Sequence, residues 1–469
     1  MRRAFACGWT ALIAVIPTVL SAQQPSLVST YGTDAGRIIA AAQGDSSAWR
    51  RLAELTDTFG NRIAGSTNLE RAIDWVLAEM KQDGFANVHG EPVMVPHWVR
   101  GTESAELISP RRVRLHMLGL GNSVGTPPAG ITAPVLVVTS FDDLQKHASE
   151  AKGKIVLFDV AFPQEGDPFF NYGNVVAYRV AGASQAAKAG AVASLIRSVA
   201  SGSMQSPHTG VMVYDSATKK IPHAALSVED AEMLHRMLDR GQKVVLTLKM
   251  QAHTLPQARS RNVVADLTGR EKPDEVVVLG GHIDSWDVGE GAMDDGGGAV
   301  AAWEAVRLLQ RLGLHPRRTV RVVLWTTEEF GGVGGVAYAK AHAADLPRHI
   351  LGLESDNGTF DPRGFMYNGT PANLPFVAQL DSLLVGLGTF HSDTGFAETD
   401  VAPLGQHGVP LLGLKVDPSR YFWYHHTDAD MMDKIDPREL ARCVAAMAVA
   451  VYVAADAPEA LVHGPDMGR

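Results

Sequence analysis

The chain has 469 residues, and at roughly 150 residues per domain it is long enough for two or three domains. Hydrophobic residues make up 46% and charged residues 20%, which excludes the disordered, collagen-like and fibrous classes. The formal net charge of −9 argues against a nucleic-acid partner, because such a partner needs a positively charged surface.

The N-terminal segment, residues 1–22, has the pattern of a cleaved secretory signal. Arg2 and Arg3 precede an apolar stretch from Ala11 to Leu20, and a polar segment begins at Gln23. The apolar stretch is short for a membrane anchor, and no later segment offers the roughly 20 apolar residues of a spanning helix. We therefore predict an exported protein, secreted or periplasmic, that has no membrane anchor.

Removal of the signal leaves a single thiol, Cys443. One cysteine cannot form a disulfide within the chain and cannot supply a cysteine-rich zinc site. Cys443 lies within an apolar helical pattern, which predicts a packing role rather than that of a nucleophile.

Two helices and two strands are predicted before residue 113. Apolar residues at helical spacing run from Trp49 to Leu55 and from Leu69 to Met80. The segments Val88 to Val99 and Ala105 to Ile108 are expected to be strands. We assign these elements to a domain that is interrupted by an insert.

Residues 113–252 are predicted to form this insert, with an α+β fold. Apolar strands are expected at 133–138, 153–158 and 190–196, and an alanine-rich helix near 181–189. His208 and His223 are isolated and are expected to be surface or packing histidines. The flanking segments, 23–112 and 253–469, then form one domain that carries the chemistry.

From residue 262 onward, short apolar runs alternate with helical patterns. The runs expected to be strands are Val276–Leu279, Val320–Trp325, Ile350–Leu353 and Leu411–Lys415. The expected helices are Ala299–Leu312, Pro375–Leu387 and Pro437 to about Ala455. This alternation predicts an α/β fold with a mostly parallel sheet that is flanked by helices on both faces. In such folds the functional site lies beyond the carboxyl ends of the strands.

Histidine or acidic residues follow these strands throughout the segment. They are His282 and Asp284, Asp294 and Asp295, Glu328 and Glu329, Glu354 and Asp356, and finally His425, His426 and Asp428. Carboxylates that converge in one cleft repel each other or hold protons unless cations are present, so the pattern predicts a metal site. A single acidic residue at a loop start often only caps a helix, but capping does not explain the whole set.

Two local spacings suggest separate roles within this site. Asp284 lies two residues after His282, where its carboxylate can accept the second N–H of the imidazole and fix the tautomer that binds metal. Glu328 and Glu329 leave a strand as neighbours and therefore point to different sides. One of them can bind metal while the other faces a water molecule. The first is then a metal ligand and the second a general base.

Five motifs, taken together, resemble a known enzyme family. They are His282-x-Asp284, Gly291–Gly298, Glu328-Glu329, Asp356 and His426. The chain resembles the two-zinc metallo-exopeptidases, a family that contains aminopeptidases and glutamate carboxypeptidases. The resemblance spans nearly the whole mature chain and implies a zinc-peptidase domain in residues 23–112 and 253–469. It also implies that residues 113–252 are an inserted protease-associated domain.

The family pattern implies a ligand set for two Zn²⁺ ions, with Asp294 as the carboxylate that bridges them. The remaining ligands are His282 and Asp356 for one ion, and Glu329 and His426 for the other. His425 adjoins His426, but the family has an aspartate four residues after the ligand, and Asp430 stands there relative to His426.

The same pattern implies hydrolysis of a peptide bond by a metal-activated water. Glu328 is the expected general acid/base, and Asp284 is counted with it as a catalytic residue because it orients His282. No Gly-x-Ser-x-Gly motif is present at a strand-to-helix turn, which disfavours serine esterase chemistry.

The expected substrates are short peptides, such as dipeptides or chains that lose an N-terminal residue. Three alternatives remain open: a carboxypeptidase, a glutaminyl cyclase that uses one zinc, and a non-catalytic binding protein of the same fold. We expect the insert to wall the active-site cleft and limit access to short peptides. Alternatively, it only stabilises the chain or forms a homodimer.

Overall fold

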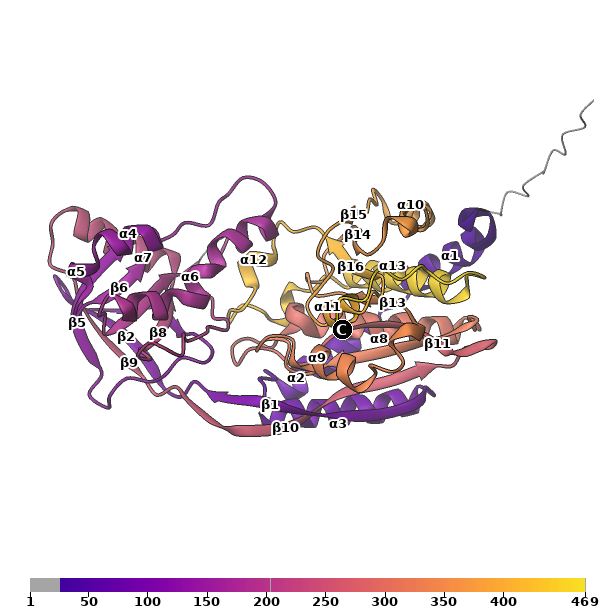
Figure 1. Ribbon diagram of the computed structural model, residues 1–469, viewed down its shortest axis with the longest axis horizontal. Helices are drawn as coiled ribbons and strands as arrows, with labels where there is room; N and C mark the ends of the chain where they lie inside the picture. Colours follow the sequence, from indigo (N-terminus) through magenta and orange to yellow (C-terminus); the bar gives the residue numbers. More distant parts are fainter. Residues whose placement is uncertain (1–25, 203, 469) are drawn as a thin grey trace, which may run out of the picture.

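Two eight-stranded sheets organise the protein, one in a larger unit and one in a smaller unit (Figure 1). This computed structural model describes residues 26–202 and 204–468. The predicted signal, residues 1–22, lies outside the described residues. Within the described ranges, no helix is both long enough and apolar enough to cross a membrane.

The larger unit, residues 26–99 and 253–468, is built on a mixed sheet. Its strands are, in spatial order, β1 (Ala86–Val99), β10 (His253–Leu267), β12 (Arg318–Trp325), β11 (Lys272–His282), β13 (His349–Glu354), β16 (Leu411–Val416), β14 (Pro362–Asn368) and β15 (Asp393–Thr394). The four central strands, β12, β11, β13 and β16, run parallel, as predicted. The outer strands β10 and β14 run antiparallel to their inner neighbours. Because the chain leaves this sheet along β1 and returns along β10, these two strands also pair antiparallel.

Alternate residues of the central strands face opposite sides of this sheet. In β11, Val277 and Leu279 face one helical layer, whereas Val276 and Val278 face the other. The first layer contains α1 (Leu27–Gln43), α2 (Ser47–Phe59), α3 (Thr67–Gln82), α8 (Gly297–Arg311) and α13 (Pro437–Asp456), with α10 (Leu374–Leu383) packed on α1. The second layer contains α9 (Val333–Ala341) and α11 (Ala402–Gln406). Helices therefore cover both faces of the sheet.

The long helix α13 forms the apolar centre of the first layer. It begins where the side chain of Asp436 accepts the N–H of Arg438, and Pro437 occupies its first turn. Most of the helix is buried, including Cys443, whose Sγ donates to the carbonyl of Phe360 at 3.1 Å. Burial raises the pKa of the Cys443 thiol, so this residue is an inert packing group, as predicted.

The smaller unit, residues 103–250, has a sheet of its own. Its strands are, in spatial order, β3 (Val113–Leu115), β2 (Glu103–Ser109), β9 (Val245–Met250), β5 (Ile131–Val138), β6 (Ile155–Phe158), β7 (Ala193–Arg197), β8 (His223–Leu226) and β4 (Met117–Gly119). Its helices are α4 (Phe141–Lys146), α5 (Ala148–Ala151), α6 (Pro168–Lys188) and α7 (Val228–Asp239). The sequence analysis placed the start of the insert at residue 113, but β2 pairs with β3 and β9 and so belongs to this second sheet. The residues of β2 predict a strand, but they do not predict which strands pair with it.

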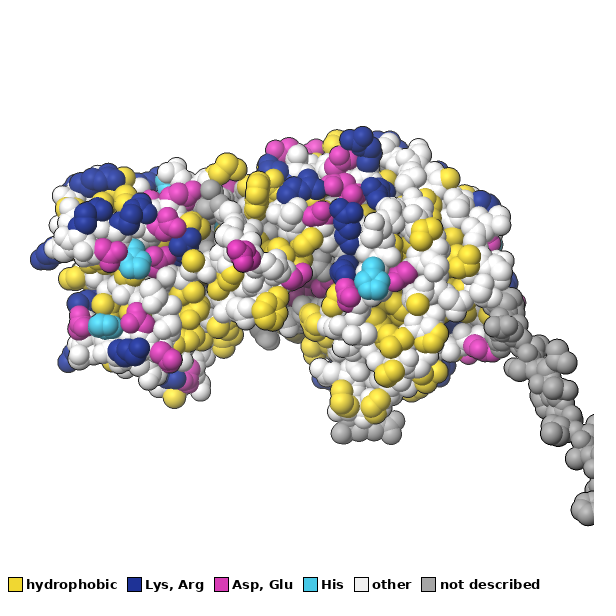
Figure 2. Space-filling view, turned by 90° about the horizontal axis from the view of Figure 1, so that it is seen from above, with side chains coloured by type: hydrophobic (Ala, Val, Ile, Leu, Met, Phe, Trp, Pro, Cys, Tyr) yellow, Lys and Arg dark blue, Asp and Glu magenta, His cyan; other side chains and the backbone are white. Residues whose placement is uncertain are grey.

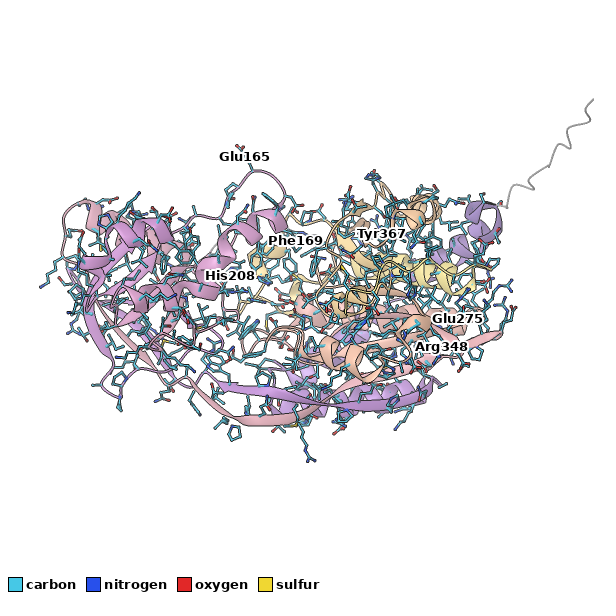
Figure 3. All side chains as sticks on the ribbon, in the orientation of Figure 1. Glu165, Phe169, His208, Glu275, Arg348 and Tyr367 are labelled. Carbon is cyan, nitrogen blue, oxygen red and sulfur yellow. The ribbon has the colours of Figure 1, made fainter. Side chains whose placement is uncertain are left out.

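Two of the contacts between the units are prominent in the ribbon (Figure 1). The paired strands β1 and β10 run side by side along the lower edge of Figure 1 and connect the two sheets. On the other side, α6 meets α12 (Tyr421–Tyr424), where the rings of Phe169 and Tyr172 lie 5.0 Å and 4.8 Å from that of Phe422. Figure 3 shows Phe169 at this junction. A cavity beside the second contact is lined by α6 and by loops of the larger unit.

Candidate active site

The predicted site residues converge at the carboxyl ends of the parallel strands. A cavity of about 930 Å³ opens there, lined by both units, and Figure 2 shows acidic side chains on the floor of the hollow between them. The side chains that come together are His282 at the end of β11, Asp294 in the turn Ala292–Gly296, Glu328 and Glu329 after β12, Asp356 after β13, and His426 after α12.

Asp294 lies between two groups of potential metal ligands. Its Oδ1 is 3.3 Å from Nε2 of His282, and that nitrogen is also 3.3 Å from Oδ1 of Asp356. Its Oδ2 is 3.2 Å from Nε2 of His426, which is 3.0 Å from Oε2 of Glu329. The two oxygens of one carboxylate therefore face two sets of atoms, each with one histidine and one further carboxylate.

Several oxygens of this cluster are buried without a hydrogen bond to any described residue. They are Oδ2 of Asp294, Oε1 of Glu329 and Oδ1 of Asp356. A buried carboxylate oxygen without a donor is unfavourable, so these atoms call for cations. Imidazole nitrogens and carboxylate oxygens are ordinary ligands of zinc, and the residues on both sides of Asp294 fit such ions.

Asp284 holds the turn that carries the two glutamates. One of its carboxylate oxygens accepts the N–H of Glu328 at 3.0 Å, and the other accepts the N–H of Glu329 at 3.4 Å. Nδ1 of His282 lies 3.0 Å from the backbone carbonyl of Asp284 and 3.5 Å from its carboxylate. The nearer acceptor for this imidazole is thus the carbonyl, while the carboxylate organises the glutamate turn.

Glu328 lines the cavity but belongs to none of the groups of described residues that could hold a metal ion. Thr327 has a φ of 66°, a left-handed conformation that a β-branched residue rarely adopts, so the chain turns sharply before Glu328. Burial and the charge of Asp356 raise the pKa of Glu328 well above its usual value. A carboxylate of this kind, beside the ligands but separate from them, can accept and return a proton.

Several buried carboxyl groups of the site have raised pKa values. Burial raises the pKa of Glu329 to about 7 and that of Asp400 to about 8, and further carboxylates add to both shifts. Burial alone lowers the pKa of His282, but the charge of Asp356 and the hydrogen bonds with Asp284, Asp294 and Asp356 together raise that pKa well above the usual value. Bound cations relieve this repulsion, which is the electrostatic reason for a metal centre here.

Two further aspartates hold the backbone around Asp294. The carboxylate of Asp430 accepts the N–H groups of Met293 and Asp294 at 2.7 Å and 3.1 Å. The carboxylate of Asp295 accepts the N–H groups of His282 and Gly298, each at 3.0 Å. Both aspartates are buried and bind peptide groups around the ligands, and Asp295 also lies within reach of a metal held by His282 and Asp356.

Arg62 fixes the loop that follows His282. Its side chain is fully buried and donates to the carbonyls of Gly60, Ile283, Glu290 and Gly291 at 2.7 to 3.1 Å. Burial lowers the pKa of Arg62 to about 10, so the guanidinium stays protonated at neutral pH. No spacing in the sequence assigned this role, because the four acceptors are backbone atoms.

The two adjacent histidines take different positions. The ring of His426 has both Asp294 and Glu329 within 3.2 Å of Nε2, whereas Nε2 of His425 is 3.7 Å from Oδ2 of Asp294. The two rings stack, with centroids 3.5 Å apart, and His425 lines the cavity. The geometry favours His426 as the ligand, although His425 also lies within reach of a metal held by Asp294.

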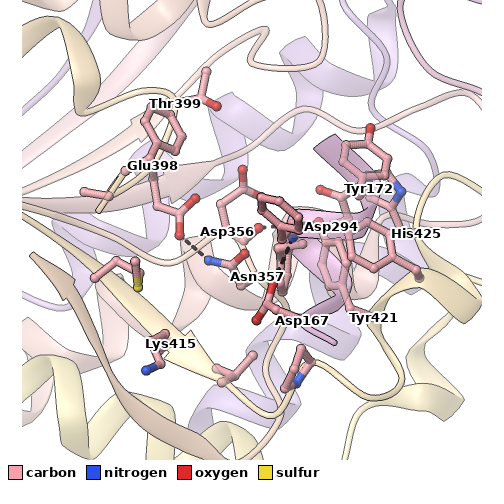
Figure 4. A pocket seen from close by; sticks show the side chains of 18 of the residues that line it. Asp167, Tyr172, Asp294, Asp356, Asn357, Glu398, Thr399, Lys415, Tyr421 and His425 are labelled. Atoms are coloured by element: carbon pink, nitrogen blue, oxygen red, sulfur yellow. Dashed lines mark hydrogen bonds and ion pairs between the residues drawn. The ribbon is translucent and has the colours of Figure 1, made fainter. Parts of the chain in front are cut away.

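Several charged residues line the cavity without having been predicted from the sequence, and two of them, Glu398 and Arg179, lie beside the proposed ligands. Glu398 lines the cavity beside Asp356 and accepts a hydrogen bond from Asn357 (Figure 4). Arg179 of α6 reaches the cavity from the smaller unit. Glu398 follows no central strand, and Arg179 lies in a segment without other chemical residues, so no local pattern marked either one.

Comparisons with known proteins agree with this geometry. The pattern of peptidase family M28 matches residues 262–451. The chain is 49% identical over 413 residues to human Carboxypeptidase Q, which covers 88% of this chain and 86% of that protein. The chain belongs to peptidase family M28. The family resemblance is thereby confirmed, and this M28 protein is a metallo-exopeptidase.

Solved structures support the M28 fold. A peptidase M28 precursor from Shewanella amazonensis SB2B has a TM-score of 0.89 at 35% identity, covering 93% of this chain and 99% of its own. A zinc aminopeptidase from Bacillus subtilis has a TM-score of 0.63 at 20% identity, covering 88% of this chain and 95% of its own. The second comparison shows likeness of fold alone.

Proposed function

We propose that this M28 enzyme is a two-zinc exopeptidase that hydrolyses dipeptides and other short peptides. One observation carries the proposal: the two oxygens of Asp294 face separate ligand sets, with His282 on one side and His426 on the other. Two adjacent ions need a carboxylate that can bind both of them. If only one ion were bound, the ligand atoms on the other side of Asp294 would have no metal. The zinc named for the Bacillus subtilis aminopeptidase, which shares the fold, supports zinc as the metal.

The residues of this chain divide the chemical work between them. Divalent ions in this position polarise the peptide carbonyl and lower the pKa of the attacking water. Glu328 faces the cavity, where it accepts the proton of that water and passes it to the leaving nitrogen. Asp284 fixes the positions of Glu328 and Glu329 by accepting their backbone N–H groups. The only thiol among the described residues, Cys443, is buried in α13 and takes no part.

Arg179 supports recognition of a substrate carboxylate. Its side chain lines the cavity, yet the residue is only 7% exposed and forms no ion pair with any described residue. Its Nε has no hydrogen-bond partner. A buried guanidinium without a counter-charge is unfavourable, so an anionic group of the substrate is its expected partner. Nη1 lies 3.4 Å from Nδ1 of His426, which places this charge beside the proposed metal ligands.

The cavity also has a carboxyl group, that of Glu398, away from Arg179 and its neighbour Tyr172 (Figure 4). The guanidinium of Arg179 lies 5.5 Å over the ring of Tyr172, and Figure 4 shows Tyr172 and Glu398 on opposite sides of Asp294 and Asp356. Glu398 lines the cavity, and burial together with the charge of Asp356 raises its pKa. A dipeptide carries an ammonium group and a carboxylate on either side of its peptide bond, so in this proposal Arg179 receives the carboxylate and the carboxyl group of Glu398 receives the ammonium group.

A panel of blocked substrates tests this function. We expect a free dipeptide to be hydrolysed efficiently, whereas both its N-acetyl and its C-amide derivatives lose most of their kcat/KM. Equal hydrolysis of the N-acetyl form identifies a carboxypeptidase, and equal hydrolysis of the amide identifies an aminopeptidase. For Arg179→Gln we expect KM to rise about tenfold or more for the free dipeptide and to stay unchanged for the amide.

We also propose that residues 1–22 direct export of the enzyme, on the basis of their charge and hydropathy pattern. N-terminal sequencing of protein from the exported fraction tests this. The expected mature chain begins at or near Gln23, and an exported chain that retains Met1 contradicts the proposal.

A further inference from the structure

We propose that Thr209, a residue of the smaller unit, positions His426 for metal binding. This inference rests on the ligand role proposed above for His426. Thr209 lies between β7 and β8 and is only 1% exposed. Its N–H donates to the carbonyl of His426 at 3.0 Å, and its own carbonyl lies 3.3 Å from Nδ1 of His426. One residue of the smaller unit therefore contacts both the backbone and the imidazole of His426.

The contact with Nδ1 determines which ring nitrogen is free to bind metal. When Nε2 of His426 is the ligand, the proton of the neutral ring is on Nδ1 and needs an acceptor. The carbonyl of Thr209 is that acceptor. Arg179 also lies near Nδ1, at 3.4 Å, but a guanidinium offers only donors and cannot accept this proton.

The contact with the backbone holds an uncommon conformation. His426 has a φ of 61°, in the left-handed region that residues with a side chain seldom adopt. Such a conformation persists only where surrounding contacts enforce it. The hydrogen bond from Thr209 to the carbonyl of His426 is one such contact, and it comes from the other unit.

Thr209 is itself anchored by its hydroxyl. Oγ1 donates to the carbonyl of Gly119 at 2.8 Å and accepts from Nη2 of Arg100 at 3.3 Å. Arg100 follows β1 and forms two hydrogen bonds, of 2.8 Å and 2.5 Å, with the carboxylate of Asp287. Asp287 lies in the loop after His282, so the chain Asp287, Arg100 and Thr209 connects the loops of both proposed ligand sets through the smaller unit.

The consequence is that the smaller unit takes part in building the metal centre in addition to lining the cavity. The hydroxyl of Thr209 fixes its backbone, and the backbone fixes His426. Removal of the hydroxyl is therefore expected to weaken the ion held by His426 and Glu329, while the ion held by His282 and Asp356 is less affected.

Three variants of the full chain test this inference. Thr209→Val removes the hydroxyl but keeps the shape, Thr209→Ser keeps the hydroxyl, and Thr132→Val is the matched control. Thr132 lies in β5 of the same unit, separated from β8 by β6 and β7, and its exposed hydroxyl bonds Thr247 at 2.8 Å. Each metal-free protein is titrated with Zn²⁺ against a chelator, and hydrogen exchange is measured for the peptides that contain Thr209 and His426.

We expect Thr209→Val to bind one of two Zn²⁺ ions about 10- to 100-fold more weakly, with faster exchange of the Thr209 amide, while the other two variants match wild type. Unchanged affinity for both ions in Thr209→Val overturns the inference. Equal loss in Thr209→Ser also overturns it, since the hydroxyl is then not the cause. If wild type itself binds fewer than two ions, the proposed two-zinc function fails instead.

Discussion

Glu328 and Glu329 are neighbours in the chain, but the turn after β12 gives them different surroundings. Glu329 lies 3.0 Å from His426, whereas Glu328 faces the cavity and lies outside the ligand sets. The amide groups of both residues are held by the single carboxylate of Asp284. One residue can thus bind metal while the other transfers protons.

Glu328→Gln tests this separation of roles. The change removes the proton acceptor and leaves the ligand sets intact, so we expect normal metal content and a loss of turnover of about 10²- to 10⁴-fold. Metal analysis and kcat for a dipeptide are the measurements. A variant that keeps its activity within a few-fold of wild type shows that another group is the base.

Asp294 and Asp356 differ in the number of ligand sets they serve. Asp294 faces both sets, whereas Asp356 lies beside His282 alone. We expect Asp294→Ala to lose both ions and Asp356→Ala to retain one, as measured by metal analysis after dialysis. Equal metal content in the two variants contradicts the bridging role.

Most of the individual site residues could be predicted from the sequence, because the ligands follow successive strands of one sheet. Asp284, Asp294 and Asp356 all stand at such positions. Arg179 and Thr209 could not be found in this way, since they belong to a helix and a loop of the other unit. Their roles depend on how the two units dock, which no local periodicity encodes.

Among the elements, α12 and α6 form the contact that closes one side of the cavity. Phe422 of α12 is buried between Phe169 and Tyr172 of α6, at centroid distances of 5.0 Å and 4.8 Å. Removal of this ring leaves a cavity at the junction. We expect Phe422→Ala to lower the free energy of unfolding by about 3–5 kcal/mol, as measured by urea denaturation.

The surface control for this prediction is Phe396→Ala, because Phe396 is 63% exposed. Its unfolding free energy is expected to change by less than about 0.5 kcal/mol. An effect of similar size in both variants argues against a specific role of the aromatic contact in stability.

Helices and strands were predicted correctly where the apolar residues have a strong periodicity. The prediction failed where the structure depends on which strands pair with each other. Helix α13 begins at Pro437 as predicted, whereas the helix α1 is not among the predicted elements. The signal for α1 was present, since Tyr31, Ala35, Ile38 and Ala42 lie on one helical face and are buried. The strand β2 was also predicted, but its membership of the second sheet depends on long-range pairing.

At the scale of the whole molecule, the smaller unit forms one wall of the cavity. Residues of α6 and of the segment before it, Asp167 to Arg179, line the cavity opposite the strand ends of the larger unit. A cavity of about 930 Å³ has the size of a site for a small ligand. This arrangement favours exopeptidase action on short peptides.

A series of alanine peptides from two to six residues tests this preference for short peptides. We expect kcat/KM to fall steeply as the chain lengthens, because additional residues clash with α6 or with the loop that carries Glu398. Comparable kcat/KM for the dipeptide and the hexapeptide contradicts the preference. The control is a dipeptide with a bulky side chain, which separates side-chain size from chain length.

The central claim is that two zinc ions share Asp294, and anomalous scattering at the zinc absorption edge tests it most directly. In crystals of the zinc-loaded enzyme, we predict two anomalous peaks about 3.5–4 Å apart, one beside His282 and Asp356 and the other beside Glu329 and His426, with one oxygen of Asp294 toward each. A single peak, or two peaks of which Asp294 contacts only one, contradicts the account.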